Sequence, residues 1–160
     1  MTTAAELAGH GRPYEVSVTC VDPSASSRAT VDVLATGHQL TADSLVSHGG
    51  EESAPHGLTF LSIAVSHCLM TELRRAAIAR GIRLERLEVR TGTTFRVEDG
   101  QYAVDTFFVD LFVEGDLTEQ QRDELGAEAR ERCGARRTLE AGARVVNRVH
   151  IGMPTDYTAS

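Results

Sequence analysis

The chain has 160 residues, of which 41% are hydrophobic, and this length and composition are typical of one soluble globular domain. The formal net charge is −7, and the 16 basic residues are all arginine and are scattered. Such a chain lacks the basic surface that binding to nucleic acid or to an anionic membrane requires. Three cysteines exclude a disulfide scaffold, and their odd number leaves at least one thiol free or paired between chains.

The N-terminal residues 1–12 are small and polar, so we expect a flexible tail followed by a single domain over residues 13–160. This tail lacks the positive and apolar regions of a signal peptide. The longest uncharged stretch, residues 54–71, contains too many polar residues to span a membrane. We therefore expect a cytoplasmic protein with reduced thiols, and in that compartment a cysteine pair is more often catalytic or redox-active than structural.

The first third of the chain predicts short strands. Residues 14–21 alternate apolar and polar side chains, residues 29–35 place their apolar side chains on one face, and residues 39–44 form a shorter third candidate. Cys20 lies on the apolar side of the first strand, which favours a place in the core. A polar loop with Gly49–Gly50 follows the strands.

Residues 58–80 predict a long helix, because they contain almost no turn residues and are rich in Leu, Ile, Ala and Met. Gly81 follows the last helical residue, where a left-handed cap is favoured. The first half of this helix is apolar nearly all round, which predicts that it is buried. Charged residues appear in the second half, so we expect that end to emerge toward solvent.

The second half of the chain predicts a hairpin, a helix and a final strand. Residues 87–97 and 102–113 alternate in hydrophobicity on either side of an Asp99–Gly100 turn. Thr118 and Gln121 form a capping box that opens a helix ending near Arg132, and Gly134 stops it. Residues 144–151 alternate as a last strand. Hairpin strands with two separate helices indicate an α+β fold rather than a parallel sheet.

The candidate chemistry rests on Cys68, in the long helix, and Cys133, at the end of the second helix. Each is consistent with a small core residue, since free cysteine is among the most buried residue types. Cys68 is flanked by the polar residues Ser66, His67 and Thr71, however, and a nearby cation can hold a cysteine as the reactive thiolate. His67 is adjacent to Cys68 in sequence, but neighbours on a helix do not face each other, so a core or interface role is favoured for it.

The chain carries none of the common signatures of other catalytic sites. No C-x-x-C, H-x-x-x-H or H-E-x-x-H spacing indicates a metal site, so we expect no metal. No P-loop, dinucleotide fingerprint or G-x-S-x-G elbow is present, and we expect no cofactor.

Three segments nevertheless resemble the OsmC/Ohr family. The run GLTFLSIAVSHCLMTELRRAAIARGIRLERLEV is similar to that family's central helix, which carries a cysteine, and its following strand. The segment GDLTEQQRDELGAEARERCGARRTL resembles the second family signature, in which a cysteine ends a helix. Upstream, TGHQLTADSLVSHGGEESAPHGL is similar to the lead-in to the central helix. The resemblance covers about residues 14–152.

The resemblance implies an α+β fold in which antiparallel sheets pack around a long buried central helix, and an intertwined homodimer. It implies thiol peroxidase activity on organic hydroperoxides, part of the response to oxidative stress. Cys68 matches the cysteine that attacks the peroxide and Cys133 the resolving cysteine, so a Cys68–Cys133 disulfide would form. Arg28 is the nearest counterpart of an assisting arginine. The family's reductant is a dithiol such as a dihydrolipoyl protein.

Two positions depart from the family pattern. Organic hydroperoxide reductases have a glutamate ten residues before the first cysteine, where this chain has Leu58. The second cysteine is followed by Gly134 instead of proline. The sequence therefore resembles a divergent branch. A catalytically diverged protein that binds a small apolar ligand at the dimer cleft is the alternative to the peroxidase, and a structural-metal protein is a more distant one.

Overall fold

The structure is a computed structural model that describes residues 18–21, 28–33 and 37–142. The chain divides into two compact units, one formed by Met1–Gly57 with His150–Ser160 and the other by Leu58–Val149. The predicted tail, residues 1–12, and the predicted last strand, residues 144–151, lie outside the described residues.

Three short antiparallel strands form the sheet of the first unit, in the order β1 (Val18–Val21), β2 (Ala29–Val33) and β3 (His38–Ala42). These strands confirm the alternating patterns seen in the sequence. The prediction that Cys20 packs in a core is wrong, because its side chain is exposed. Among the described strands β1 lies at an edge of the sheet, and pairing of Cys20 with Val31 on β2 does not cover the thiol.

The loop after β3 is organised around Asp43, which is only 3% exposed. Its carboxylate accepts hydrogen bonds from the backbone N–H groups of Ser44, Glu51 and Ser53 and from the Ser53 hydroxyl. The Ser53 donors are the largest cause that lowers the pKa of Asp43 to about 2. The carboxylate thus binds both ends of the loop, at Ser44 and at Glu51 and Ser53. Between them lies one 3₁₀ turn, Val46–His48.

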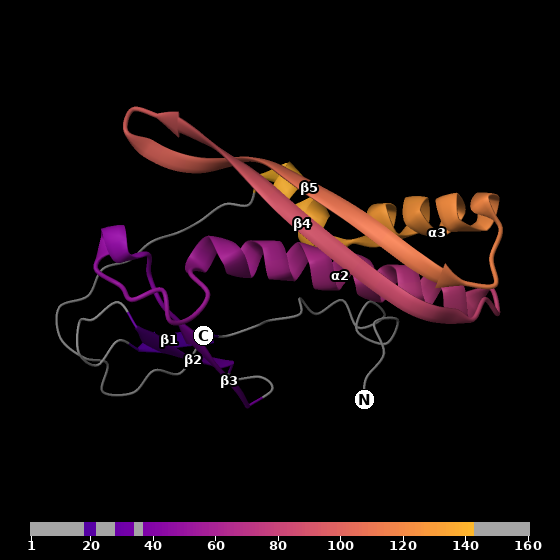
Figure 1. Cartoon of the computed structure of the whole chain (residues 1–160), viewed down its shortest axis with the longest axis horizontal. Coiled ribbons are helices and arrows are strands. Elements are labelled where there is room, and N and C mark those ends of the chain that lie inside the picture. The colour runs from indigo at the N-terminus through magenta and orange to yellow at the C-terminus, as the bar shows by residue number, and fades with distance from the viewer. Residues whose placement is uncertain (1–17, 22–27, 34–36, 143–160) are drawn as a thin grey trace, which may run out of the picture. The chain divides into compact units, whose positions relative to one another are not determined.

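The second unit is built on a long helix, α2 (Gly57–Ala79), and a long hairpin of β4 (Leu84–Glu98) and β5 (Gln101–Gly115). Gly81 has the predicted left-handed backbone, with φ 67°, and Ile82 N–H donates to Ala77 O at 3.0 Å. At the hairpin tip both Asp99 and Gly100 have positive φ, as a two-residue turn of this kind requires. Figure 1 shows the hairpin as one long ribbon that crosses α2.

Two further helices complete this unit, α3 (Glu119–Arg132) and α4 (Gly134–Ala141). The predicted capping box is present: Gln121 N–H donates to Thr118 Oγ1 at 3.2 Å, and Thr118 N–H donates to Gln121 Oε1 at 2.8 Å. The predicted end of α3 near Arg132 is confirmed, but the sequence did not predict α4, which begins at Gly134. No helix in the described part of the chain has both the length and the apolar character to cross a membrane.

The core of the second unit lies between α2, α3 and one face of the hairpin. Its fully buried members are Leu73, Ala76 and Ala77 of α2 with Leu125 and Ala129 of α3. The pairing of Leu87 with Val113 and of Val89 with Leu111 sets the apolar residues of both strands on the same face. Leu87, Leu111 and Val113 pack against the buried helical residues, so the helices cover this face.

The burial of α2 differs from the prediction. Its first half is the less covered part, with Leu61 38% and Ile63 48% exposed, whereas the deepest burial falls in the second half at Leu73, Ala76 and Ala77. The hairpin and α3 cover only one side of the helix within this unit. An exposed stripe of Ala64, His67, Thr71, Arg74 and Ile78 follows the other side at helical spacing.

Candidate thiol site

Cys68 lies near the middle of α2, on the side of the helix that faces the rest of the second unit. It is partly buried and packs against a small buried cluster of Val65, Leu69 and Cys133. Val65 and Leu69 lie four residues apart on α2 and therefore on the same face of the helix. Together they form an apolar wall beside the Cys68 thiol. Val109 and Leu111 of β5 complete this wall.

Cys133 stands at the junction of α3 and α4 and is fully buried. Its extended backbone, with ψ 104°, ends α3, and its N–H donates to Ala129 O at 3.0 Å. The same residue caps the next helix, because Arg136 N–H donates to Cys133 Sγ at 3.4 Å. Leu125, Ala129 and Cys133 follow one another at intervals of four residues, and all three are buried, so the sulfur points into the core.

The fold brings the two thiols together although they are far apart in the chain. Both are free, and Cys68 packs against the buried cluster that contains Cys133. Burial, followed by the neighbouring Cys68 thiol, raises the pKa of Cys133 from 9.0 to about 11, against the opposing effect of the Arg136 N–H. At neutral pH Cys133 is therefore a protonated thiol, and Cys68 is the more accessible member of the pair.

The other residues singled out in the sequence lie elsewhere. His67 is exposed on the outer stripe of α2, away from the covered side of the helix. Ser66 donates to Ser62 O at 2.7 Å and shares a very short hydroxyl–hydroxyl hydrogen bond with Thr91 of β4, so it ties α2 to the hairpin. Arg28 belongs to the first unit, where it is exposed directly before β2, and its role beside Cys68 stays a prediction.

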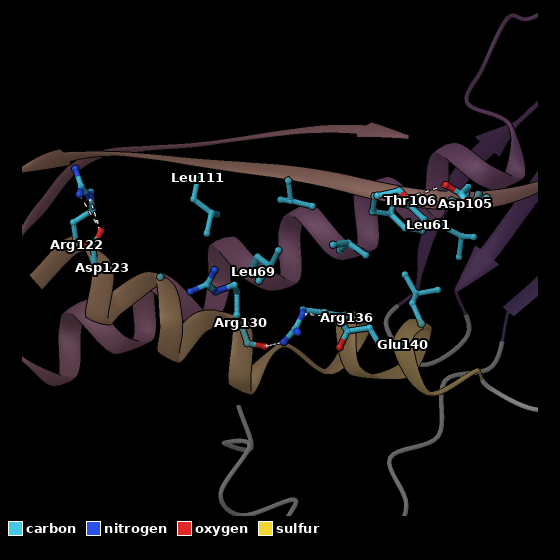
Figure 2. Close-up of a pocket in the computed structure, with 16 residues that line it drawn as sticks. Leu61, Leu69, Asp105, Thr106, Leu111, Arg122, Asp123, Arg130, Arg136 and Glu140 are labelled. Atoms are coloured by element: carbon cyan, nitrogen blue, oxygen red, sulfur yellow. Dashed lines mark hydrogen bonds and ion pairs between the residues drawn. The ribbon is translucent and has the colours of Figure 1, made fainter. Parts of the chain in front are cut away.

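A groove of about 770 Å³ runs beside the thiol pair within the second unit. Side chains from α2, β5, α3 and α4 line it, as Figure 2 shows. Its apolar wall consists of Leu61, Val65, Leu69, Val104, Phe107, Val109, Leu111 and Leu139. Four of these, Val65, Leu69, Val109 and Leu111, also pack in the cluster around the cysteines, so the groove and the thiol cluster share part of their walls.

Sequence reasoning missed Arg136, which contributes twice to this region. Its backbone N–H binds the Cys133 sulfur, and its guanidinium donates to Arg130 O at 2.8 Å and pairs with Glu140 at 2.9 Å. The available signal was its position three residues after Cys133, where a capping side chain meets a backbone N–H. Cysteine is an uncommon cap, and so the start of α4 was not expected.

Within the described ranges, no three His, Cys, Asp or Glu side chains are grouped so that they could hold a metal ion. The site is therefore defined by two neighbouring thiols in an α+β fold, a partly buried Cys68 and a buried Cys133 that caps a helix.

This combination is matched by a known family. The family model described as OsmC-like protein matches residues 49–147. The chain belongs to the OsmC-like family, as the resemblance of its three segments indicated. A comparison with curated proteins gives no match.

Solved structures share the fold at low identity. An OsmC-like protein from Mycoplasma pneumoniae is 18% identical with a TM-score of 0.70, covering 82% of this chain and 91% of its own. An OsmC-like protein of unknown function from Vibrio cholerae is 17% identical with a TM-score of 0.69, covering 80% and 95%. An organic hydroperoxide resistance protein OsmC from Legionella pneumophila is 16% identical with a TM-score of 0.65, covering 80% and 90%. These matches confirm the predicted α+β, OsmC-like fold.

Proposed function

We propose that this chain is a thiol-dependent peroxidase that reduces organic hydroperoxides through Cys68 and Cys133. The observation that carries the proposal is the proximity of these two thiols, which are free and lie together in an apolar cluster. Two neighbouring thiols can be oxidised to a disulfide and reduced again by exchange with another thiol. The named relative from Legionella pneumophila, an organic hydroperoxide resistance protein, supports the substrate class.

The roles of the two cysteines follow from their surroundings. The thiolate is the nucleophile in peroxide reduction, and burial raises the pKa of Cys133 to about 11, which keeps it protonated. Cys68 is the more accessible thiol and is the one a substrate reaches first. Cys68 therefore attacks the peroxide, and Cys133 is the resolving thiol that reacts with the oxidised Cys68.

The catalytic cycle of peroxide reduction has three steps. The Cys68 thiolate attacks one peroxide oxygen, the O–O bond breaks, and an alcohol leaves once its oxygen takes a proton, so that Cys68 becomes a sulfenic acid. The Cys133 sulfur then displaces water from the sulfenic acid and forms the Cys68–Cys133 disulfide. A dithiol reductant such as a dihydrolipoyl group restores both thiols by exchange and is itself oxidised to a disulfide.

The proposal includes a homodimer and the help of an arginine. The exposed stripe of α2, which includes Ala64, His67, Thr71 and Ile78, offers a surface for a second copy of the chain. Arg28 is the guanidinium that we assign to assist the Cys68 thiolate, since a cation lowers the pKa of a neighbouring thiol and can bind a peroxide oxygen.

Stopped-flow oxidation of the reduced protein by cumene hydroperoxide tests the proposal. We expect rapid loss of two thiols and a disulfide that joins Cys68 to Cys133 in peptide mass spectrometry. Cys68→Ser should abolish the rapid phase, and Cys133→Ser should leave a sulfenic or higher oxide on Cys68. Cys20→Ser is the matched control, because Cys20 is exposed in the other unit, and it should react like the wild type.

A rate equal to that of free cysteine would reject the peroxidase. The alternative, a catalytically diverged protein that binds a small apolar ligand, would then hold, and it is favoured by Leu58 at the position of the usual glutamate. Arg28→Gln separates the assisting role: we expect a slower rapid phase at unchanged disulfide yield, whereas an unchanged rate would remove Arg28 from the site.

A further inference from the structure

We propose that the groove beside the thiol pair binds a free aliphatic carboxylate, with Arg130 holding the carboxylate group and the apolar wall holding the chain. This site goes beyond the peroxidase chemistry, because neither Cys68 nor Cys133 is among the side chains that line the groove. Its size, about 770 Å³, lies within the range of pockets that enclose small ligands.

The ion pairs in the groove leave one arginine free to bind the carboxylate of a ligand. Three arginines line it: Arg122 pairs with Asp123 at 2.9 Å, and Arg136 pairs with Glu140 at 2.9 Å. Arg130, by contrast, makes no ion pair with any carboxylate of the described residues. Figure 2 shows its side chain extending from α3 into the groove, on the side of Leu69 and Leu111. An unpaired guanidinium at an apolar wall suits a ligand that is anionic at one end only.

Neither Glu128 nor Glu131, the carboxylates closest to Arg130 in the sequence of α3, forms an ion pair with it. Glu128 is already shared between Arg80, at 2.5 Å, and Arg132, at 3.2 Å. The backbone at Arg130 is also fixed, because the Arg136 guanidinium donates to its carbonyl oxygen at 2.8 Å. The Arg130 side chain is exposed, and its guanidinium makes no hydrogen bond or ion pair with the described residues, so its donors are available to a ligand.

The chemistry of the wall defines the rest of the ligand. Half of the lining side chains are aliphatic or aromatic, and they form the apolar part of the groove surface where α2, β5 and α4 line it. A flexible alkyl chain gains free energy from covering such a surface, whereas a sugar or nucleotide would leave polar groups unpaired there. A planar carboxylate can accept two parallel hydrogen bonds from one guanidinium.

Titration calorimetry with decanoate and its neutral counterpart decan-1-ol tests the role of Arg130. The reduced full-length protein should bind decanoate at least about tenfold more tightly than decan-1-ol, as a charge-assisted hydrogen bond implies. Arg130→Gln should remove this difference, and Arg130→Lys should keep part of it. Arg75→Gln, which removes a paired arginine of α2 outside the groove, is the control and should bind both ligands like the wild type.

Substitution of Gly126 tests independently whether the ligand binds in this groove. It lines the groove from α3, and a Cβ added there meets no atom within 4 Å, so a larger side chain enters open space without disturbing the helix. Gly126→Leu should weaken the binding of both ligands about tenfold or more, while Gly126→Ala should bind as the wild type does. Circular dichroism of each variant confirms that it is folded.

Several results would overturn the proposal. It is wrong if decanoate does not bind, if Arg130→Gln binds decanoate as tightly as the wild type, or if Gly126→Leu has no effect. A sedimentation coefficient that changes in Gly126→Leu but not in Gly126→Ala would identify the groove as a contact with a second copy instead. Oxidation of the thiols by cumene hydroperoxide is measured separately in Arg130→Gln, where we expect the wild-type rate, so failure of the groove site is distinguishable from failure of the peroxidase.

Discussion

The backbone N–H of Arg136 lies 3.4 Å from the sulfur of Cys133, so one cysteine ends α3 and begins α4. Cys68 on α2 packs against the buried cluster to which Cys133 belongs. Cys133 thus joins three helices: it closes one, caps the next and packs against the third. A change in the protonation or oxidation of Cys133 therefore affects the packing of all three helices.

The raised pKa of Cys133 predicts a loss of stability at alkaline pH. The folded thiol titrates at about 11 and the unfolded thiol near 9.0, so the folded state binds this proton more tightly. Its contribution to stability is full below pH 9 and falls as the pH rises toward 11. Urea denaturation of the reduced protein at several pH values measures this fall. Cys133→Ser should lack that part of the pH dependence, and an identical profile in the variant would contradict the prediction.

Asp43 predicts the opposite pH dependence in the first unit. Hydrogen bonds, chiefly from Ser53, lower the pKa of its carboxyl from 3.8 to about 2. The stabilisation is therefore present above pH 3.8 and is lost as the pH falls toward 2. A carboxyl titration followed by NMR should give this low value. Ser53→Ala removes the hydroxyl donor and should raise the pKa of Asp43, whereas Ser44→Ala keeps its backbone donor and should change it little.

Two glycines predict opposite effects of the same substitution. Gly126 lies inside α3 with open space at its Cβ position, so Gly126→Ala should stabilise the protein by about 0.5–1 kcal/mol. A Cβ on Gly50 would meet Ser44 O at 2.1 Å, so Gly50→Ala should destabilise it by about 1–3 kcal/mol. The free energy of unfolding in urea measures both. Equal signs for the two substitutions would contradict this reading of the backbone.

A core leucine and an exposed isoleucine of α2 test the observed burial. Leu73 is 1% exposed, and Leu73→Ala should cost about 2–5 kcal/mol through lost burial and a cavity. Ile78 is 69% exposed, so Ile78→Ala should change the free energy of unfolding by less than about 0.5 kcal/mol in the monomeric chain. A large loss at Ile78 would mean that another surface covers it, such as the second copy proposed above.

Local signals in the sequence were sufficient for most elements of the second unit. The Asp99–Gly100 turn, the Thr118–Gln121 capping box and the Gly81 cap each depend on residues within one turn of each other, and each is confirmed. The helix α4 was not anticipated, because it starts from a cysteine cap. The burial of α2 was predicted at the wrong end, since hydrophobicity along a helix does not say which side its neighbours cover.

The sequence by itself determined most of the described elements and indicated the family, because period, turn chemistry and caps are properties of neighbouring residues. It also marked Cys68 and Cys133 as candidates. Only the tertiary structure decided that they lie in one cluster, that Cys133 is the buried partner with the raised pKa, and that Arg130 lines a groove without pairing with a carboxylate of the described residues. These relationships join residues from different helices and strands, and the packing of α2, α3 and the hairpin sets them.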